Sequence, residues 1–356
     1  MTTPRYRANE LVAFAAALLS SAALEPAKSQ AVAEVLVEGD LLGHTTHGLQ
    51  LLPGYLTDLD SGAMAKSGSP RVIAEAPAAV TWDGMRLPGP WLVQQAVALA
   101  SERARRNGAC CVVIRRSHHI ASLAAYLRPV AEQGLMILLT CSAPDIATVA
   151  PAGGKGRVLT PNPIAAGWPA KGGPVMMDFS TSITSNALSK RLHAEKRRLP
   201  GAWALDAAGN PTDDPGVLFR DPRGSLLPTG GLDHGHKGFA LALLVEALTG
   251  GLAGHGRADA PTQWTNTVFL QVFDPARFAG ADDFTRQVDF VADACRNSPP
   301  LPPVARVRLP GETALRRRAE QLAGGVQLYP GVFDSLLTWA RKLNVRAPAM
   351  LASPQA

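Results

Sequence analysis

Four apolar runs in the middle of the chain constrain the fold most strongly. Each is rich in β-branched or aliphatic residues and ends in small or polar residues, a pattern that indicates strands bounded by turns. Strand ends that open onto loops are common positions for binding and catalytic residues. We therefore expect a mixed α/β chain with its site at strand ends. The runs are CCVVIRR (110–116), LMILLTCS (135–142), VLTPNPIAAGWP (158–169) and PVMMDFSTS (174–182).

Helical patterns flank these runs. Apolar residues recur at helical spacing from residue 9 to about residue 40, with a break at Pro26, and again from Pro90 to about residue 107. No strand is followed by GxGxxG and no GxxxxGK[ST] loop occurs in the sequence, so a nucleotide would be bound in another way. Further strands are expected at 71–76 and 79–84, and further helices at 238–254, 312–325 and 333–345.

The N-terminal apolar stretch 11–24 loosely resembles a secretory signal because Arg5 and Arg7 precede it. Glu10 interrupts the basic flank, Asn9 suits a helix cap, and the stretch is too short to span a bilayer. We expect a buried, alanine-rich helix here, and no membrane association. The adjacent Cys110 and Cys111 lie in a strand-like run and form no CxxC pair, which favours reduced thiols in a cytoplasmic protein.

Composition sets only broad limits. The 356 residues are 46% hydrophobic and 18% charged, as in ordinary globular proteins. The net charge of +6 is compatible with anionic ligands of several kinds. The basic segment KRLHAEKRRLP (190–200) contains no aromatic residue, so we expect no nucleic-acid binding and, at most, positive potential near an anionic cofactor.

Seven of the eight histidines fall in short polar clusters. A histidine can transfer protons near neutral pH, bind a metal, or satisfy a buried hydrogen bond, and for a lone histidine the last role is the commonest. HTTH (44–47) lacks the glutamate of HExxH and no thiolate pair accompanies it, so we expect no catalytic metal. A histidine-metal hydrolase stays open as a less favoured alternative, and HGHK (234–237) could bind metal adventitiously.

The most distinctive segment is GHTTHGLQLLPGY (43–55), where a helix gives way at Gly43 to hydroxyls and imidazoles. Polar side chains at a helix break are well placed to meet a ligand. Thr45 and Thr46 as ordinary helix caps would account for one hydroxyl, but not for His44 and His47.

Seven ordered motifs, spread from about residue 9 to about residue 341, resemble those of one family. This family comprises the malate/L-lactate dehydrogenase-like (sulfolactate dehydrogenase-like) oxidoreductases, which include ureidoglycolate dehydrogenase, diketogulonate reductase and cyclic imino-acid reductases. The motifs are GHTTHGLQLLPGY, SHHIASLAAY, APDIATVAPAGG, LTPNPIAAGWP, MDFSTS, LPGAWALDAAGNPTDDP and HGHKGFALALLVEALTGGL.

The resemblance implies an α/β fold that binds NAD or NADP without a Rossmann domain, on a central, largely antiparallel sheet. Residues 1–75 with 305–356 would form a discontinuous helical unit, and residues 76–304 the cofactor-binding domain. It also implies a homodimer with the site near the subunit boundary. The implied reaction is hydride transfer between the nicotinamide cofactor and a small 2-oxo or 2-hydroxy acid.

The resemblance also assigns roles to residues. The family's Ser-His-Gly step reads Thr46, His47 and Gly48 here, and its Ser-Asn-His motif ends at His119. Hydride delivery to a ketone creates alkoxide character, so either His47 or His119 could supply the proton. The implied cofactor-binding residues are Ser142, Pro161, Asn162, Asp178, Phe179, Ser180, Thr181, His236, Lys237, Gly311 and Glu312.

One departure concerns the substrate carboxylate. Many relatives have an arginine three residues after the glycine of the first motif, where this chain has Leu51. Tyr55, Gln50 and Arg116 are candidate substitutes, and we expect Thr46 and Tyr55 to bind substrate. A pocket opened by Leu51 would suit a cyclic imino acid, the alternative substrate class. A binding protein without turnover is the remaining alternative.

Overall fold

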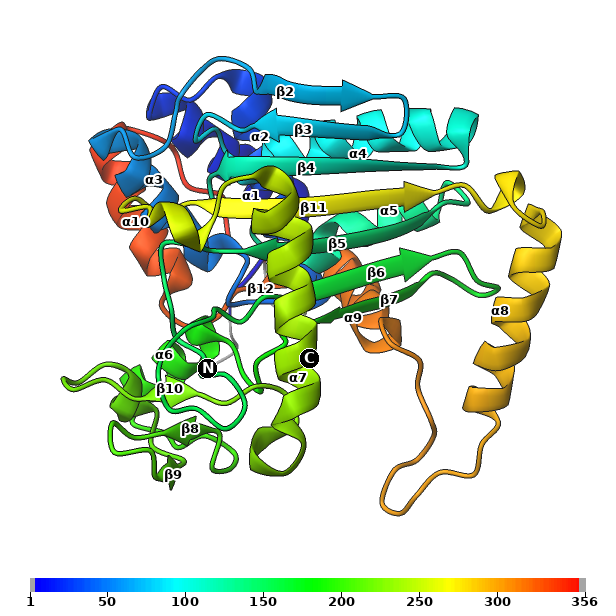
Figure 1. The fold of residues 1–356 in the computed structure, drawn as a ribbon. Coiled ribbons are helices and arrows are strands. Elements are labelled where there is room, and N and C mark those ends of the chain that lie inside the picture. Colours follow the sequence, from blue (N-terminus) through cyan, green and yellow to red (C-terminus); the bar gives the residue numbers. More distant parts are fainter. Residues whose placement is uncertain (1–3, 352–356) are drawn as a thin grey trace, which may run out of the picture.

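The computed structural model describes residues 4–351 and is built on a seven-stranded sheet in the order β2-β3-β4-β11-β5-β6-β7 (Figure 1). Only β3 and β4 pair in parallel, so the expected largely antiparallel sheet is confirmed. The strands are β2 (Arg71–Ala76), β3 (Ala79–Asp83), β4 (Ala109–Ser117), β5 (Met136–Ser142), β6 (Ile164–Trp168), β7 (Val175–Phe179) and β11 (Asn266–Phe273).

Helices cover both faces of the sheet. α4 and α5 pack on one face, with α1 and α2 behind them, and α7 crosses the other face and ends in a π-helical turn at Ala247–Gly251 (Figure 1). α8 stands at the margin of the molecule. The helices are α1 (Ala8–Ser21), α2 (Pro26–Leu42), α3 (Leu52–Ser61), α4 (Gly89–Asn107), α5 (Leu127–Ala131), α6 (Asn186–Ala194), α7 (Gly231–Glu246), α8 (Ala281–Arg296), α9 (Glu312–Gly324) and α10 (Val332–Leu343).

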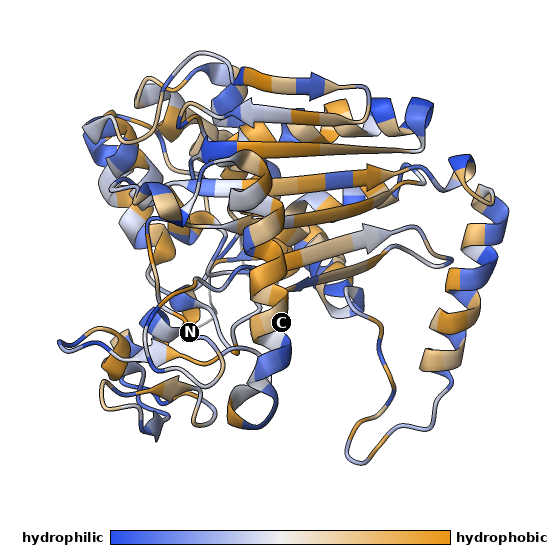
Figure 2. Cartoon of the chain, viewed as in Figure 1, coloured by the Kyte–Doolittle hydropathy of each residue, from blue (hydrophilic) through white to orange (hydrophobic). Residues whose placement is uncertain are grey.

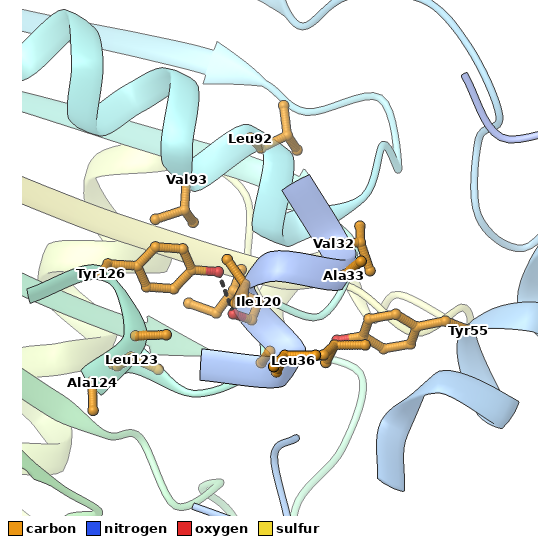
Figure 3. Packing of buried hydrophobic residues seen from close by; sticks show 14 of the residues in the cluster. Val32, Ala33, Leu36, Tyr55, Leu92, Val93, Ile120, Leu123, Ala124 and Tyr126 are labelled. Carbon is orange, nitrogen blue, oxygen red and sulfur yellow. Dashed lines mark hydrogen bonds between the residues drawn. The ribbon is translucent and has the colours of Figure 1, made fainter. Parts of the chain in front are cut away.

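One hydrophobic core joins the N-terminal helices to the sheet. Leu11, Leu18 and Leu19 of α1 are fully buried, so the N-terminal apolar stretch is a core helix, as expected. Figure 3 shows Val93 of α4 beside the ring of Tyr126, whose hydroxyl donates to the Ile120 carbonyl at 2.6 Å, and α2 between Tyr126 and Tyr55. Apolar residues are concentrated on the central strands (Figure 2). Each fully buried leucine contributes about 1.5–3 kcal/mol to stability.

The N-terminal and C-terminal segments of the chain lie side by side, as expected for a unit formed by residues 1–75 and 305–356. β1 (Arg5–Tyr6) pairs antiparallel with β12 (Val326–Gln327), and α2 packs on α9. The expected boundary at residue 75 falls inside β2, and the helices before it share their core with the sheet. The two-part division of the chain therefore stays a prediction.

A separate lobe has its own small core. It combines α6 with a three-stranded sheet and packs Leu159, Leu192, Val217 and Leu226 together. We call it the small lobe. Its strands are β8 (Ala204–Leu205), β9 (Pro211–Thr212) and β10 (Ser225–Leu226). Within residues 4–351, no helix has both the length and the apolar character needed to cross a membrane.

Candidate active site

A cavity of about 1270 Å³ lies at the ends of β4, β5 and β7 and reaches α6 of the small lobe. The loop after α2 and the segment before α10 complete its walls. It therefore forms where the sequence places polar residues after strands. Of the predicted site residues, Thr46, His47, His119, Pro161, Asn162, Asp178, Phe179 and Ser180 line it.

The loop that carries His47 is held tightly against α2. Gly43 ends the helix with a left-handed φ of 88°, and a Cβ on Gly48 would fall 2.3 Å from the Asp40 carboxylate. The Leu49 amide donates to Asp40 Oδ2 at 2.8 Å. Burial raises the pKa of Asp40 to about 7. The buried carboxyl of Asp40 thus anchors this loop to α2.

His47 is a neutral imidazole at neutral pH. Burial lowers its pKa to about 4, and the nearby His44 and Arg191 act in the same direction. The Thr46 hydroxyl lies 2.8 Å from His47 Nδ1, which orients the ring. Thr46 therefore fixes the orientation of the His47 ring, and this is a different role from capping a helix.

The adjacent His118 and His119 point in different directions. His118 is buried, with Nε2 3.0 Å from Asp58 Oδ2, which is the ordinary structural role of a histidine. His119 lines the cavity, and its Nδ1 accepts the Ala121 amide at 3.2 Å and lies 2.8 Å from the Tyr55 hydroxyl. Because Nδ1 accepts a hydrogen bond, the proton of the neutral ring is on Nε2.

His47 and His119 come together across the cavity. Their rings stack with centroids 6.0 Å apart and an interplanar angle of 21°. Burial lowers the pKa of His119 well below its usual value, and the neighbouring His47 and His118 further disfavour its protonation. Trp264, which the sequence analysis did not select, packs on His119 with centroids 5.0 Å apart. Two uncharged imidazoles thus face one ligand space, where a bound anion would favour their protonation.

Asp178 sits at the end of β7 in the cavity wall. It accepts the Ala124 amide at 2.8 Å and lies 3.9 Å from His44 Nδ1. Burial raises the pKa of Asp178, while His44 opposes that shift. Cys141 also lines the cavity, but burial and Asp178 raise its pKa to about 12, so it is a thiol and not a nucleophilic thiolate.

Ser142 and Asn162 are both bound by Glu246 of α7. Ser142 Oγ, Asn162 Nδ2 and Arg257 Nε donate to Glu246 Oε1 at 2.8, 2.9 and 2.9 Å. Arg257 donates further to Thr160 Oγ1 at 3.2 Å. Neither Glu246 nor Arg257 was predicted from the sequence as a site residue. The signal that could have found Glu246 is a single charge inside the apolar helix GFALALLVEALTGG.

Six predicted cofactor-binding residues lie outside the cavity wall, among them Ser142, which is bound to Glu246. His236 and Lys237 are exposed on α7, and Gly311 and Glu312 begin α9, beside a separate pocket of about 260 Å³. Glu312 pairs there with Arg296 at 2.9 Å. Their contact with a cofactor stays a prediction, as does that of Ser142 and of Thr181, which are both buried.

Of the three candidate substitutes for the missing arginine, only Gln50 lines the cavity. Arg116 is bound to Asp83, with Nη2 to Oδ2 at 2.6 Å, and does not line the cavity. Tyr55 is fully buried and does not line the cavity; its hydroxyl bonds to His119, and its ring also packs on His118. Leu51 and Gln50 line the cavity. Of the basic cluster at 190–200, Lys190 and Arg191 line it as well, which the sequence analysis did not foresee for individual residues. Within residues 4–351, no three potential metal ligands gather in one place.

Known proteins resemble this chain over nearly its whole length. An L-lactate dehydrogenase of Cupriavidus necator is 33% identical over 89% of this chain and 91% of its own. A Δ1-pyrroline-2-carboxylate/Δ1-piperideine-2-carboxylate reductase of Pseudomonas syringae pv. tomato is 33% identical over 84% and 86%. The structure of malate dehydrogenase from Pyrococcus horikoshii matches with a TM-score of 0.86 and 27% identity, covering 97% of both chains.

The family profile described as malate/L-lactate dehydrogenase matches residues 6–337, a range that contains the imidazole pair and every wall of the cavity. Relatives with this profile are dehydrogenases or reductases of hydroxy or imino acids, and the family implies a nicotinamide cofactor and a small acid substrate. The chain is therefore an oxidoreductase that belongs to the malate/L-lactate dehydrogenase family.

Proposed function

We propose that this protein catalyses reversible hydride transfer between NAD or NADP and a small 2-oxo or 2-hydroxy acid, with His47 and His119 handling the proton. The observation that carries the proposal is the stacked pair of neutral imidazoles inside the cavity. Neither ring is engaged by a carboxylate within 4.0 Å among the described residues, so both remain available to a ligand.

The cavity fits a dinucleotide together with a small acid. Pockets for single drug-sized ligands occupy about 300–1,000 Å³, and this one measures about 1270 Å³. Its walls combine apolar side chains such as Phe179 and Ile146 with the polar Ser180 and Asn186 and the cation Lys190, a composition suited to a ring system with phosphates. A bound nicotinamide cofactor would supply the hydride.

The protein's own groups handle the substrate oxygen. The Nε2–H of His119 is a hydrogen-bond donor, and the Ala121 amide and the Tyr55 hydroxyl fix the ring from its other nitrogen. His47 is fixed by Thr46. A substrate carboxylate near either ring raises its pKa, so the proton for the developing alkoxide enters together with the acid.

A cyclic imino acid is the second candidate substrate, since Leu51, Leu123 and Trp264 give the cavity an apolar wall against which a ring can pack. The Pseudomonas syringae relative acts on such compounds by name. A six-membered imine would bring its carboxylate to the same polar groups.

The test is a spectrophotometric assay of NADH and NADPH oxidation with a panel of 2-oxo acids and cyclic imino acids. We expect turnover with one class and one preferred cofactor. A His47→Ala/His119→Ala double variant, confirmed as folded by circular dichroism, should lose turnover while still binding the reduced cofactor. Unchanged turnover in that variant would refute the assigned roles.

We further propose a cytoplasmic homodimer. Leu243 and Leu244 on α7 and Phe290 and Val291 on α8 are strongly exposed apolar side chains, and α8 projects from the sheet domain (Figures 1 and 2). The four cysteines are all unpaired, in keeping with a reducing compartment. Light scattering on wild type and on a Leu244→Asp/Phe290→Asp variant should show a dimer and a monomer.

A further inference from the structure

Arg191 reaches the cavity from α6 of the small lobe. Ser185 caps this helix by accepting the Leu188 amide at 3.1 Å, so the helix has a fixed start six residues before Arg191. The guanidinium carbon lies 3.6 Å from the centroid of the Tyr329 ring. Stacking on one face leaves the N–H groups free to point within the guanidinium plane. The side chain is therefore positioned before any ligand arrives.

The guanidinium also contacts the loop that carries His47. Nη1 donates to Thr45 Oγ1 at 3.0 Å, and Nη2 donates to Gln50 Oε1. Nε is buried and has no hydrogen-bond partner within residues 4–351. Because a guanidinium carries five N–H donors, most of this one's donor capacity is unused.

Within residues 4–351, Arg191 forms no ion pair, although Glu195 and Asp40 are near enough to raise its pKa against the effect of burial. No Asp or Glu oxygen lies within 4.0 Å of its nitrogens in the described part of the chain, although each of several other arginines has such a partner. Glu195 is nearby, but it pairs with Arg197 at 3.0 Å and accepts the Tyr329 hydroxyl. A partly buried cation with unused donors is costly unless an anion completes it.

We propose that Arg191 binds the carboxylate of the substrate, so that this anion is held by the small lobe and not by the segment that contains Leu51. The inference rests on the proposed function, because it names the group that recognises its acid. Planar N–H donors match a carboxylate in a two-point contact. Arg191 bonds to Thr45, two residues before His47, and lines the same cavity as His47 and His119, so a carboxylate anchored there leaves the neighbouring carbonyl carbon facing the imidazole pair.

The experiment compares wild type with Arg191→Met and Arg191→Lys. Arg198→Met is the matched control, since Arg198 belongs to the same basic cluster but is exposed and pairs with Asp213 at 3.2 Å. Oxamate, a non-reactive 2-oxo acid analogue, is titrated by calorimetry in the presence of the reduced cofactor. Cofactor binding is measured separately by its fluorescence.

We expect Arg191→Met to weaken oxamate binding by about 100-fold, as loss of one partner of a charge pair predicts, and Arg191→Lys to weaken it less. KM for the acid should rise in parallel, and cofactor affinity should stay unchanged. Arg198→Met should behave as wild type. The methyl ester of a turned-over acid should lose little on Arg191→Met, because it lacks the charge.

Three results would overturn the inference. One is unchanged oxamate affinity in folded Arg191→Met. Another is weaker cofactor binding with unchanged oxamate binding, which would assign Arg191 to a cofactor phosphate. The third is no oxamate binding to wild type. If wild type turns over no member of the substrate panel, the proposed function fails instead; oxamate affinity still reports on Arg191 by itself.

Discussion

Arg191 lines the cavity, and Arg257 lies behind its wall, where it bonds to the lining residues Ile146 and Thr160. The two arginines are bonded very differently. Arg257 pairs with Glu246 at 2.9 Å and also donates to Ile146, Ser142 and Thr160. Arg191 has two hydrogen bonds, a buried unpartnered Nε and no ion pair within residues 4–351. The difference separates an arginine that holds loops in place from one that is kept ready for a ligand.

The largest effect should appear at the imidazole pair beside Arg191. His119→Ala should reduce kcat/KM for the acid by about 1,000-fold, within the usual range for removing a positioned acid or base. Stopped-flow kinetics measures the hydride step directly. His119→Asn serves as the smaller polar replacement, and a rate loss below tenfold in both variants would move the proton-transfer role to His47 alone.

Removing the carboxylate that pairs with Arg257 should lower the stability of the protein more than its activity. Glu246→Ala leaves Arg257 without its carboxylate and Ser142 and Asn162 without their acceptor, so we expect a loss of about 3 kcal/mol in the free energy of unfolding. Urea titration measures it, with exposed Glu320→Ala as control. Glu246→Gln, which keeps one acceptor oxygen, should lose less. Equal losses for Glu320→Ala and Glu246→Ala would contradict a structural role.

Asp40, which anchors the loop that Arg191 contacts, makes the stability of the protein depend on pH. Its folded pKa of about 7 lies above the unfolded value, so the folded state binds more protons between the two. Stability from this group is complete below about pH 4 and is lost as pH rises through about 7. Asp40→Asn should therefore gain about 2 kcal/mol over wild type at pH 8 relative to pH 5, after allowance for relaxation of the buried site. Asp282→Asn, at an exposed position on α8, should show no such difference.

The smallest effect should be on the stability of Arg191→Met. Its two hydrogen bonds and its stacking are offset by release of an uncompensated cation, so the free energy of unfolding should change by less than about 1 kcal/mol. Thermal unfolding at equal ionic strength compares it with Glu246→Ala. A loss as large as that of Glu246→Ala would erase the distinction between the two arginines.

The spacing of apolar residues in the sequence was enough to predict the helices that bury one face and the strands that are buried on both faces. The helices around Pro26, the helix ending near residue 107 and the four central runs all formed, with β4 to β7 at their places. β11 and α8 were missed. β11 is the strand between β4 and β5. Its run NTVFLQVF follows a segment with Gly254, Gly256 and Pro261, so a strand was readable there, but its central place in the sheet was not. Strand order depends on pairings distant in the sequence, which periodicity does not contain.

Candidate site residues were predictable where polar groups cluster, as at residues 44–47 and 118–119. The family resemblance selected His119 and not His118. The residues alone did not show why, because the orientation of the two rings depends on Asp58 and Tyr55 from α3. Arg191 and Glu246 were missed for a related reason. Arg191 is one of several cations in its segment, and Glu246 is a single charge among apolar neighbours. Only tertiary packing shows whether their hydrogen-bond donors and acceptors have partners.

The small lobe has a core of its own, and it contributes Lys190 and Arg191 to a cavity whose imidazoles belong to the main body. A ligand held from both sides acts as a removable crosslink. Its binding free energy adds to the attachment of the lobe, so local opening of that lobe becomes rarer in proportion to occupancy. Amide hydrogens of α6 and β8 thus become reporters of ligand affinity that require no chemical step.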